Sequence, residues 1–179
     1  MPRLHKEPRT QILQPLTKIF NHSVKLGKVP KDWKLANVTP IYKKGDKKVT
    51  LNYRPISLTS VTSKIIEKII RDRLARFLES NNIISDNQHG FRNKRSCLTN
   101  LLDFFHNINM NWDKQIPSDV IYLDFQKAFN KVLHERLLRK LQATGLGDNV
   151  CAWIRDWLAS RKQRVVLNGQ FSEWLPVTS

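Results

Sequence analysis

The sequence predicts an α+β fold of mixed helices and short strands, and three observations lead to that prediction. Apolar residues recur at helical spacing in several stretches, short apolar runs bounded by turn residues alternate with them, and Asn168-Gly169 lies between two of these runs. Asn-Gly in that setting is the strongest short-range signal of a β-hairpin. The 179 residues suffice for one domain, or for one domain and part of a second.

The N-terminal part is expected to begin with a helix. Residues 1–10 are polar, and we expect them to be disordered. Apolar side chains recur at helical spacing over 11–26 and predict a helix there, which Gly27 ends. The connector 29–33 then leads to the first extended segment.

A hairpin with a basic tip is expected next. Residues 36–42 form a short apolar run interrupted by Pro40, which favours an edge strand or a bulge. Residues 52–58 form a second extended segment. The turn between them, 43–48, contains four lysines.

Two helices are expected in the middle of the chain. The first covers 61–79 behind the candidate cap Ser60, and basic residues flank its apolar stripe. Those basic residues are Lys64, Lys68, Arg71, Arg73 and Arg76. They suit contact with phosphates and equally suit a solvated helix face. After a loop, the second helix covers residues 96–111.

The C-terminal part is expected to contain a buried strand, two helices and the Asn-Gly hairpin. The strand is 119–125, an apolar, β-branched run that ends on a carboxylate. Helices are expected over 127–143, stopped by Gly145, and over 150–160. The hairpin covers 163–177.

Charge indicates the class of partner. Lys and Arg together number 31 against 15 Asp and Glu, a formal net charge of +16. So positive a chain attracts polyanions, with nucleic acid first and an anionic membrane surface second. The membrane interpretation is weak because no run of about 18 apolar residues is present. No apolar signal segment follows the basic N-terminus, so we expect an intracellular protein of the nucleus or the cytoplasm.

Cysteine usage gives no evidence of a metal centre. Cys97 and Cys151 lack CxxC spacing and have no Cys or His partners nearby in the sequence. We expect two small buried thiols in a reducing compartment rather than metal ligands or a disulfide.

Asp124 is the first candidate for chemistry, and two interpretations of it are open. A carboxylate at the end of an apolar strand is costly to bury unless it is paired or binds a cation. Polymerases hold Mg²⁺ with such a group, and Mg²⁺ prefers hard oxygen ligands. An aspartate at a strand end also caps the helix that follows. Taken alone, the residue favours the cap.

Two basic segments leave similar alternatives. Arg54 lies near the lysines of the hairpin tip, where a guanidinium clamps a triphosphate or is simply solvated. The loop 90–96 combines a glycine, Phe91 and three cations. It suits a nucleic-acid backbone with a stacked base, and alternatively Phe91 anchors the loop in the core.

Three ordered segments resemble successive blocks of the reverse transcriptases of non-LTR retrotransposons, and the jockey-like branch resembles them best. The segments are Asn52–Ser60, Gln88–Arg92 with Arg95-Ser96, and Tyr122–Phe129. Trp33-Lys34, Trp153-Ile154 and Trp157-Leu158 also look like that family. The resemblance runs from about residue 10 to the last residue.

The resemblance implies a right-hand polymerase fold, with fingers over 11–117 and the start of the palm over 118–179. The implied activity is RNA-directed DNA polymerisation, the addition of deoxynucleotides to a 3′-hydroxyl opposite an RNA template. The implied cofactor is Mg²⁺, and the implied partners are an RNA template, a DNA primer or target, and dNTPs.

The resemblance also assigns roles to palm residues. Asp124 matches the first metal-binding, catalytic aspartate of the family. Phe129 matches the bulky residue under the incoming sugar that discriminates against a 2′-hydroxyl. The backbone from Phe125 to Ala128 would face the triphosphate.

Roles in the fingers follow in the same way. Arg54 matches the arginine that contacts the triphosphate, and Lys43 or Lys44 lies where a lysine assists it. The residues that belong to the block near the template and the nucleotide pocket are Gln88, Arg92 and Arg95.

Two departures from the family pattern stand out. The family usually has aspartate at Asn130, which is not a metal ligand there, so the change indicates drift or altered hydrogen bonding. The Gly-x-Pro-Gln-Gly and Ala-Asp-Asp blocks are absent from these residues. A two-metal site needs several carboxylates, so we expect a fragment that is inactive by itself. The alternative is a non-catalytic basic nucleic-acid-binding module, or a relic of a decayed element.

Overall fold

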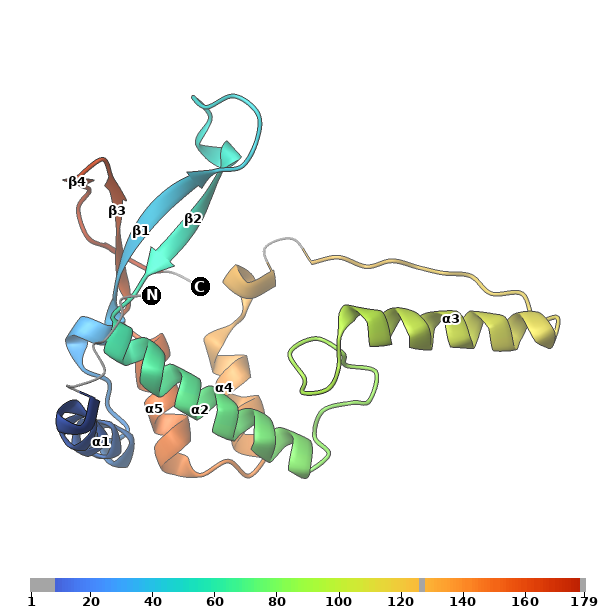
Figure 1. The fold of residues 1–179 in the computed structure, drawn as a ribbon, viewed down its shortest axis with the longest axis horizontal. Helices are drawn as coiled ribbons and strands as arrows, with labels where there is room; N and C mark the ends of the chain where they lie inside the picture. Colours follow the sequence, from blue (N-terminus) through green and yellow to red (C-terminus); the bar gives the residue numbers. More distant parts are fainter. Residues whose placement is uncertain (1–8, 126–127, 178–179) are drawn as a thin grey trace. The chain divides into compact units, whose positions relative to one another are not determined.

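The computed structural model describes residues 9–125 and 128–177, which form two compact units. The first unit runs to Ile69 and resumes at Asn130, and the second unit is Ile70–Phe129. Helices and a mixed sheet occur together, so the α+β prediction is confirmed (Figure 1). Among the described residues, all ten buried hydrophobic side chains lie in the first unit.

The N-terminal helix, α1 (Arg9–Leu26), ends at Gly27 as predicted. Disorder was expected over residues 1–10; residues 1–8 lie outside the described residues, whereas Arg9 and Thr10 already belong to α1. Gly27 has φ +63°, and a Cβ there would lie 2.8 Å from Cβ of Ala152 on α5 (Asp148–Leu158). Glycine therefore serves both the left-handed turn and the close approach of the two helices.

The predicted basic hairpin is confirmed. β1 (Leu35–Tyr42) pairs antiparallel with β2 (Tyr53–Leu58) along its outer part. β3 (Lys162–Leu167) pairs parallel with β1 only from Leu35 to Val38. Among the described strands, β1 is therefore internal in its first half and an edge on the β3 side at Pro40. A proline, which has no N–H to donate, is tolerated at such an edge.

The predicted Asn-Gly hairpin is also confirmed. β4 (Gln170–Phe171) and β5 (Leu175–Pro176) both pair antiparallel with β3, in a sheet of order β2-β1-β3-β4. Asn168 has φ 50° and Gly169 has φ 78°. Two positive φ values in a two-residue turn match the twist of the flanking strands, which explains the preference for Asn-Gly.

Helices pack together in the core of the first unit. Ile66 on α2 (Val61–Ser80) is 1% exposed, and Trp153 on α5 is 2% exposed. The indole N–H of Trp153 donates to Oγ of Ser23 on α1 at 2.9 Å, and that of Trp157 donates to Oε1 of Glu67 on α2 at 3.0 Å. Trp153 is therefore buried and Trp157 half-buried, each with its indole N–H satisfied.

The helix expected over 127–143 is interrupted, which is a correction. A 3₁₀ turn, Ala128–Lys131, comes first, and α4 (His134–Ala143) follows. Leu133 between them has extended backbone, with φ −71° and ψ 110°. The interrupted stretch contains Asn and Val, which are weaker helix formers than the Leu, Arg and Lys of α4.

The second unit contains the end of α2, a loop, and α3 (Cys97–Asp113). Ser96 and Thr99 form a capping box, because the Ser96 N–H donates to Oγ1 of Thr99 at 2.9 Å and the Thr99 N–H donates to Oγ of Ser96 at 3.2 Å. No residue of α3 is buried. Cys97 is accordingly exposed, contrary to expectation, whereas Cys151 is buried as expected.

The buried strand expected over 119–125 is wrong. The segment forms no strand, and Ile121, Tyr122 and Leu123 are 82, 83 and 85% exposed. The described strands pair with one another, and none of them pairs with this segment. An apolar run becomes a buried strand only where neighbouring strands satisfy its backbone groups and other elements cover its faces.

Asp156 on α5 joins the helices to the segment that precedes β1. Its carboxylate accepts a hydrogen bond from the amide of Val29 at 2.8 Å and lies 2.9 Å from Nζ of Lys34 and 3.6 Å from Nζ of Lys28. Partial burial raises the pKa of Asp156, but the Val29 amide and the two lysines outweigh it, so the pKa lies below its usual range. The charged carboxylate therefore stabilises the fold.

Asp156→Asn should destabilise the chain by about 1–3 kcal/mol at neutral pH, because the amide keeps the shape but loses the charge. A lowered folded-state pKa contributes stability that is complete above the unfolded value of about 3.9 and is lost as the pH falls through the folded value. Thermal unfolding should thus separate wild type from variant at pH 7 and bring them together in acid.

The matched control is Asp32→Asn, which alters an exposed carboxylate in the 3₁₀ helix Lys31–Lys34. Its melting temperature should stay near that of the wild type. Equal losses in the two variants at pH 7 would show that Asp156 has no special role.

Candidate nucleic-acid interface

The residues singled out in the sequence are divided between the two units. Those of the first unit are Lys43, Lys44 and Arg54. Those of the second unit are Gln88, Arg92, Arg95, Asp124, Phe125, Ala128 and Phe129. Each group therefore has its own local geometry, built by a hairpin in one case and by loops in the other.

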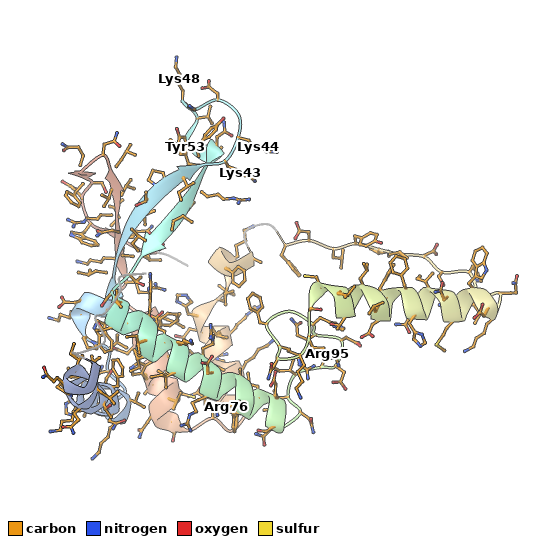
Figure 2. All side chains as sticks on the ribbon, in the orientation of Figure 1. Lys43, Lys44, Lys48, Tyr53, Arg76 and Arg95 are labelled. Carbon is orange, nitrogen blue, oxygen red and sulfur yellow. The ribbon has the colours of Figure 1, made fainter. Side chains whose placement is uncertain are left out.

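Tyrosines and an asparagine hold the basic tip of the β1–β2 hairpin. The Tyr42 hydroxyl donates to the carbonyl of Gly45 at 2.5 Å, and the Tyr53 hydroxyl donates to the carbonyl of Lys47 at 2.9 Å. The Asn52 side-chain amide donates to the carbonyl of Asp46 at 2.8 Å. Figure 2 shows Lys43, Lys44 and Lys48 around this tip, with Tyr53 at its base. The tip is thus a defined turn.

The cations of the hairpin face solvent. Lys43, Lys44 and Arg54 are all exposed. Among the described residues, no ion pair joins any of these three to a carboxylate. Exposed cations without a carboxylate partner are open to phosphate oxygens, and an arginine can take two of them at once.

Arg92 and Arg95 hold the loop of the second unit. The Arg92 side chain is 16% exposed and donates to the carbonyl of Ser85 at 2.9 Å. Arg95 lies 3.8 Å from Asp86 and 3.5 Å from Asp103 on α3. Both guanidiniums therefore have a structural role that sequence reasoning missed, and their nucleic-acid contacts stay a prediction.

His89 is the buried polar residue of this loop. It is 7% exposed, its Nδ1 lies 2.9 Å from Oγ1 of Thr99, and its Nε2 lies 3.1 Å from Oδ2 of Asp103. The neighbouring Gln88 side chain donates to the carbonyl of Gly90 at 3.1 Å. The sequence offered one signal for the contact between His89 and Thr99. Thr99 follows His89 by ten residues and belongs to the capping box of α3.

Phe91 is presented to solvent rather than to the core. It is 91% exposed and has φ 59°, and its ring lies edge to face with that of Phe129, 6.2 Å between centroids. The interpretation of Phe91 as a core anchor is therefore wrong. Left-handed backbone costs a non-glycine residue about 1–2 kcal/mol, and strain of this kind gathers at functional sites.

Asp124 follows the exposed run at 119–123 and is itself exposed, so the expected burial of this carboxylate is wrong. Phe125 and Phe129 are likewise 81 and 79% exposed, and Ala128 begins the 3₁₀ turn. The cap interpretation is not supported for α4, whose N-cap is Leu133.

A metal site needs more than the described residues supply. Within 9–125 and 128–177, no three His, Cys, Asp or Glu side chains group closely enough to hold a metal ion. Asp124 offers one carboxylate, whereas a two-metal site needs several. The donor set around Asp124 is therefore incomplete for Mg²⁺.

The basic residues of α2 form a solvated face. Lys64, Lys68, Arg71, Arg73 and Arg76 are all exposed. Arg71 lies 2.7 Å from the neighbouring Asp72. Arg76, labelled in Figure 2, lines a shallow surface hollow with Arg73 and Phe77. In the described part of the chain, no helix is both long and apolar enough to cross a membrane.

Comparisons with known proteins agree on one family. The family model "Reverse transcriptase (RNA-dependent DNA polymerase)" matches residues 41–178. The chain is 33% identical over 138 residues to the probable RNA-directed DNA polymerase from transposon X-element of Drosophila melanogaster. It is 32% identical over 128 residues to the probable RNA-directed DNA polymerase from transposon BS of the same species.

A longer alignment joins the chain to the RNA-directed DNA polymerase from mobile element jockey of Drosophila melanogaster, at 30% identity over 173 residues. The X-element, BS and jockey alignments cover 76, 71 and 94% of this chain. They cover only 15, 14 and 18% of the respective relatives. The chain thus spans less than a fifth of the length of these relatives.

Phe91→Asn should leave the thermal stability of the chain unchanged or raise it by up to about 1 kcal/mol, because Asn tolerates the left-handed backbone. The matched control is Phe77→Asn, a half-buried phenylalanine on α2 that should be destabilising. Melting temperatures of both variants provide the measurement. A large loss from Phe91→Asn would mean that the ring supports the fold after all.

Proposed function

The chain belongs to the reverse transcriptase family, and we propose that it forms part of an RNA-directed DNA polymerase of a non-LTR retrotransposon. The observation that carries the proposal is the family match over 41–178, which includes the hairpin tip with β2, the loop of Phe91 and the Asp124 segment. In the longer protein, the reaction adds deoxynucleotides to a 3′-hydroxyl opposite an RNA template.

The proposed architecture is the right hand of polymerases, with residues 11–117 as fingers and 118–179 as the start of the palm. This division follows the sequence blocks of the family, whereas the two compact units divide the chain at Ile69 and Asn130. The sheet supports the proposal to the extent that it presents a basic hairpin at one end.

The hairpin is the proposed contact for the nucleotide triphosphate. Arg54 is exposed on β2, and Lys43 and Lys44 are exposed at the adjoining tip. A guanidinium with two flanking ammonium groups complements the negative charge of a triphosphate. Tyr42 and Tyr53 fix the turn, which lowers the entropy lost when phosphate binds.

The Asp124 segment is the proposed contribution to the catalytic centre. Asp124 would supply one carboxylate toward a metal ion, in a site that needs several. Mg²⁺, the expected ion, would supply positive charge to the phosphate oxygens there. Phe129 is proposed to exclude ribonucleotides by its bulk, since its ring is exposed.

The second candidate function is non-catalytic binding of nucleic acid. The observation that favours it is the set of exposed cations on the hairpin and α2, in a chain of net charge +16. Such binding needs no metal and rests on counterion release from phosphates. Both candidates require the chain to bind nucleic acid, and only the first requires Asp124.

Binding of the 179-residue chain to single-stranded RNA should weaken with salt. If about five phosphates are neutralised, log K falls against log salt with a slope near −3.5, from about 0.7 for each phosphate. Lys43→Gln/Lys44→Gln should reduce the slope by about 1.4. Fluorescence anisotropy between about 50 and 200 mM salt measures this.

The control is Lys25→Gln/Lys114→Gln, which removes two exposed lysines outside the hairpin. Its slope should stay near the wild-type value. A flat salt dependence of the wild-type chain would contradict electrostatic binding.

A chimera tests the polymerase proposal. Residues 10–179 should replace the aligned segment of the jockey polymerase, and primer extension on an RNA template with dNTPs and Mg²⁺ should continue. Asp124→Asn should reduce extension to the level seen without Mg²⁺, because the amide lacks the anionic oxygen that the ion selects. The chain alone should extend no primer.

The matched control is Asp119→Asn, an exposed carboxylate five residues earlier in the same segment. That chimera should extend primers at the unsubstituted rate. Extension that survives Asp124→Asn, or a chimera that is inactive although folded, would count against a catalytic role for these residues.

A further inference from the structure

An arginine on β3 lies over two aromatic rings, one on β4 and one in the segment that follows β4. The Arg164 guanidinium carbon is 4.2 Å from the ring centroid of Phe171 and 4.6 Å from that of Trp174. Its Nε donates to Oδ1 of Asn37 on β1 at 2.8 Å. A planar cation that contacts two rings and is anchored at Nε has few rotamers left. We call these three side chains the Arg164 stack.

Strand pairing and hydrogen bonds also fix the backbone around the Arg164 stack. Val166 lies opposite Phe171 in the β3–β4 pairing. Ser172 donates its N–H to the carbonyl of Val165 at 3.0 Å, and its hydroxyl accepts from the Val165 N–H at 2.9 Å. The backbone at Phe171 and Ser172 is therefore fixed to β3. The side chains of the stack are thus ordered before any ligand binds.

The rings remain open to solvent despite this order. Phe171 is 57% exposed and Trp174 is 37% exposed. Around them, segment 160–177 carries the cations Arg161, Lys162 and Arg164, and Glu173 as its one carboxylate. Exposed aromatic faces in a positively charged setting are the features with which proteins bind single strands.

We propose that the Arg164 stack binds bases of single-stranded nucleic acid. The inference shares with the proposed function only the class of partner, because none of the three side chains belongs to the hairpin tip or to the Asp124 segment. Bases of a single strand stack on the ring faces, and Arg161 and Lys162 neutralise the phosphates on either side. A duplex, whose bases are already stacked, does not bind there.

The competing explanation is that the stack only stabilises the hairpin. Surface cation–π contacts contribute to folding without any ligand. The two explanations differ in whether binding affinity depends on the bases. A stack that only stabilises the hairpin would not change the affinity for a probe that carries bases. A probe without bases therefore separates the explanations.

The experiment compares two probes of equal length and charge, oligo(dT) of twelve nucleotides and a twelve-unit abasic deoxyribose-phosphate strand. Affinities for the full chain are measured at one fixed salt concentration, so that the phosphate contribution is the same. Stacking of one base is worth about 1–3 kcal/mol, which converts to about fivefold or more. The wild-type chain should prefer oligo(dT) by at least that factor.

Trp174→Leu and Phe171→Leu should each remove most of this preference while leaving affinity for the abasic strand within about twofold. Arg164→Lys keeps the charge but removes the planar group that contacts both rings, so it should also lower the preference. The matched control is Trp112→Leu, because Trp112 is 76% exposed on α3 and lies outside the stack. That variant should bind like the wild type.

Equal affinity of the wild-type chain for the two probes would overturn the Arg164 stack as a base-binding site and leave charge-driven binding intact. If the chain bound neither probe, both the base-binding site and charge-driven binding would be overturned. Loss of the preference in Trp112→Leu but not in Trp174→Leu would also overturn the inference. Circular dichroism of each variant verifies that the exposed substitutions leave the fold unchanged.

Discussion

The Asp156 carboxylate is the contact on which the arrangement of the first unit depends. It reaches from α5 to the amide of Val29 and to Lys34, on either side of the buried Trp33. These contacts fix the chain just before β1, and β1 pairs with both β2 and β3. The β1–β2 pairing positions the basic hairpin tip. The β1–β3 pairing positions Arg164 beside Asn37. A charge removed from water is stabilising here because its partners are close and their hydrogen bonds are complete.

The second unit is organised differently. Its described residues include no buried hydrophobic side chain, and a polar network around His89, Asp103 and Arg95 joins the loop to α3. Most apolar residues of α3 and of 119–125 are exposed. An exposed apolar area of this kind marks an interaction surface.

Local patterns predicted the elements whose causes are local. The helix that ends at Gly27 and the Asn168-Gly169 hairpin depend on spacing and turn chemistry, and both formed as expected. The strand at 119–125 failed because strand formation depends on partners that a pattern does not contain. The Arg164 stack was missed although its signal was present. A two-residue turn places Val166 opposite Phe171, and that register brings Arg164 to the segment that follows.

Among the site residues, the sequence did not predict which side chains are exposed. Lys43, Lys44 and Arg54 are open, as a phosphate contact requires, whereas Arg92 and Arg95 are engaged by Asp86 and Asp103. The most direct test of a role in polymerisation is whether Phe129→Ala changes the choice of nucleotide in the jockey chimera. We expect this variant to incorporate ribonucleotides more readily, because the bulk proposed to lie under the sugar is gone. Discrimination equal to that of the unsubstituted chimera would contradict that role.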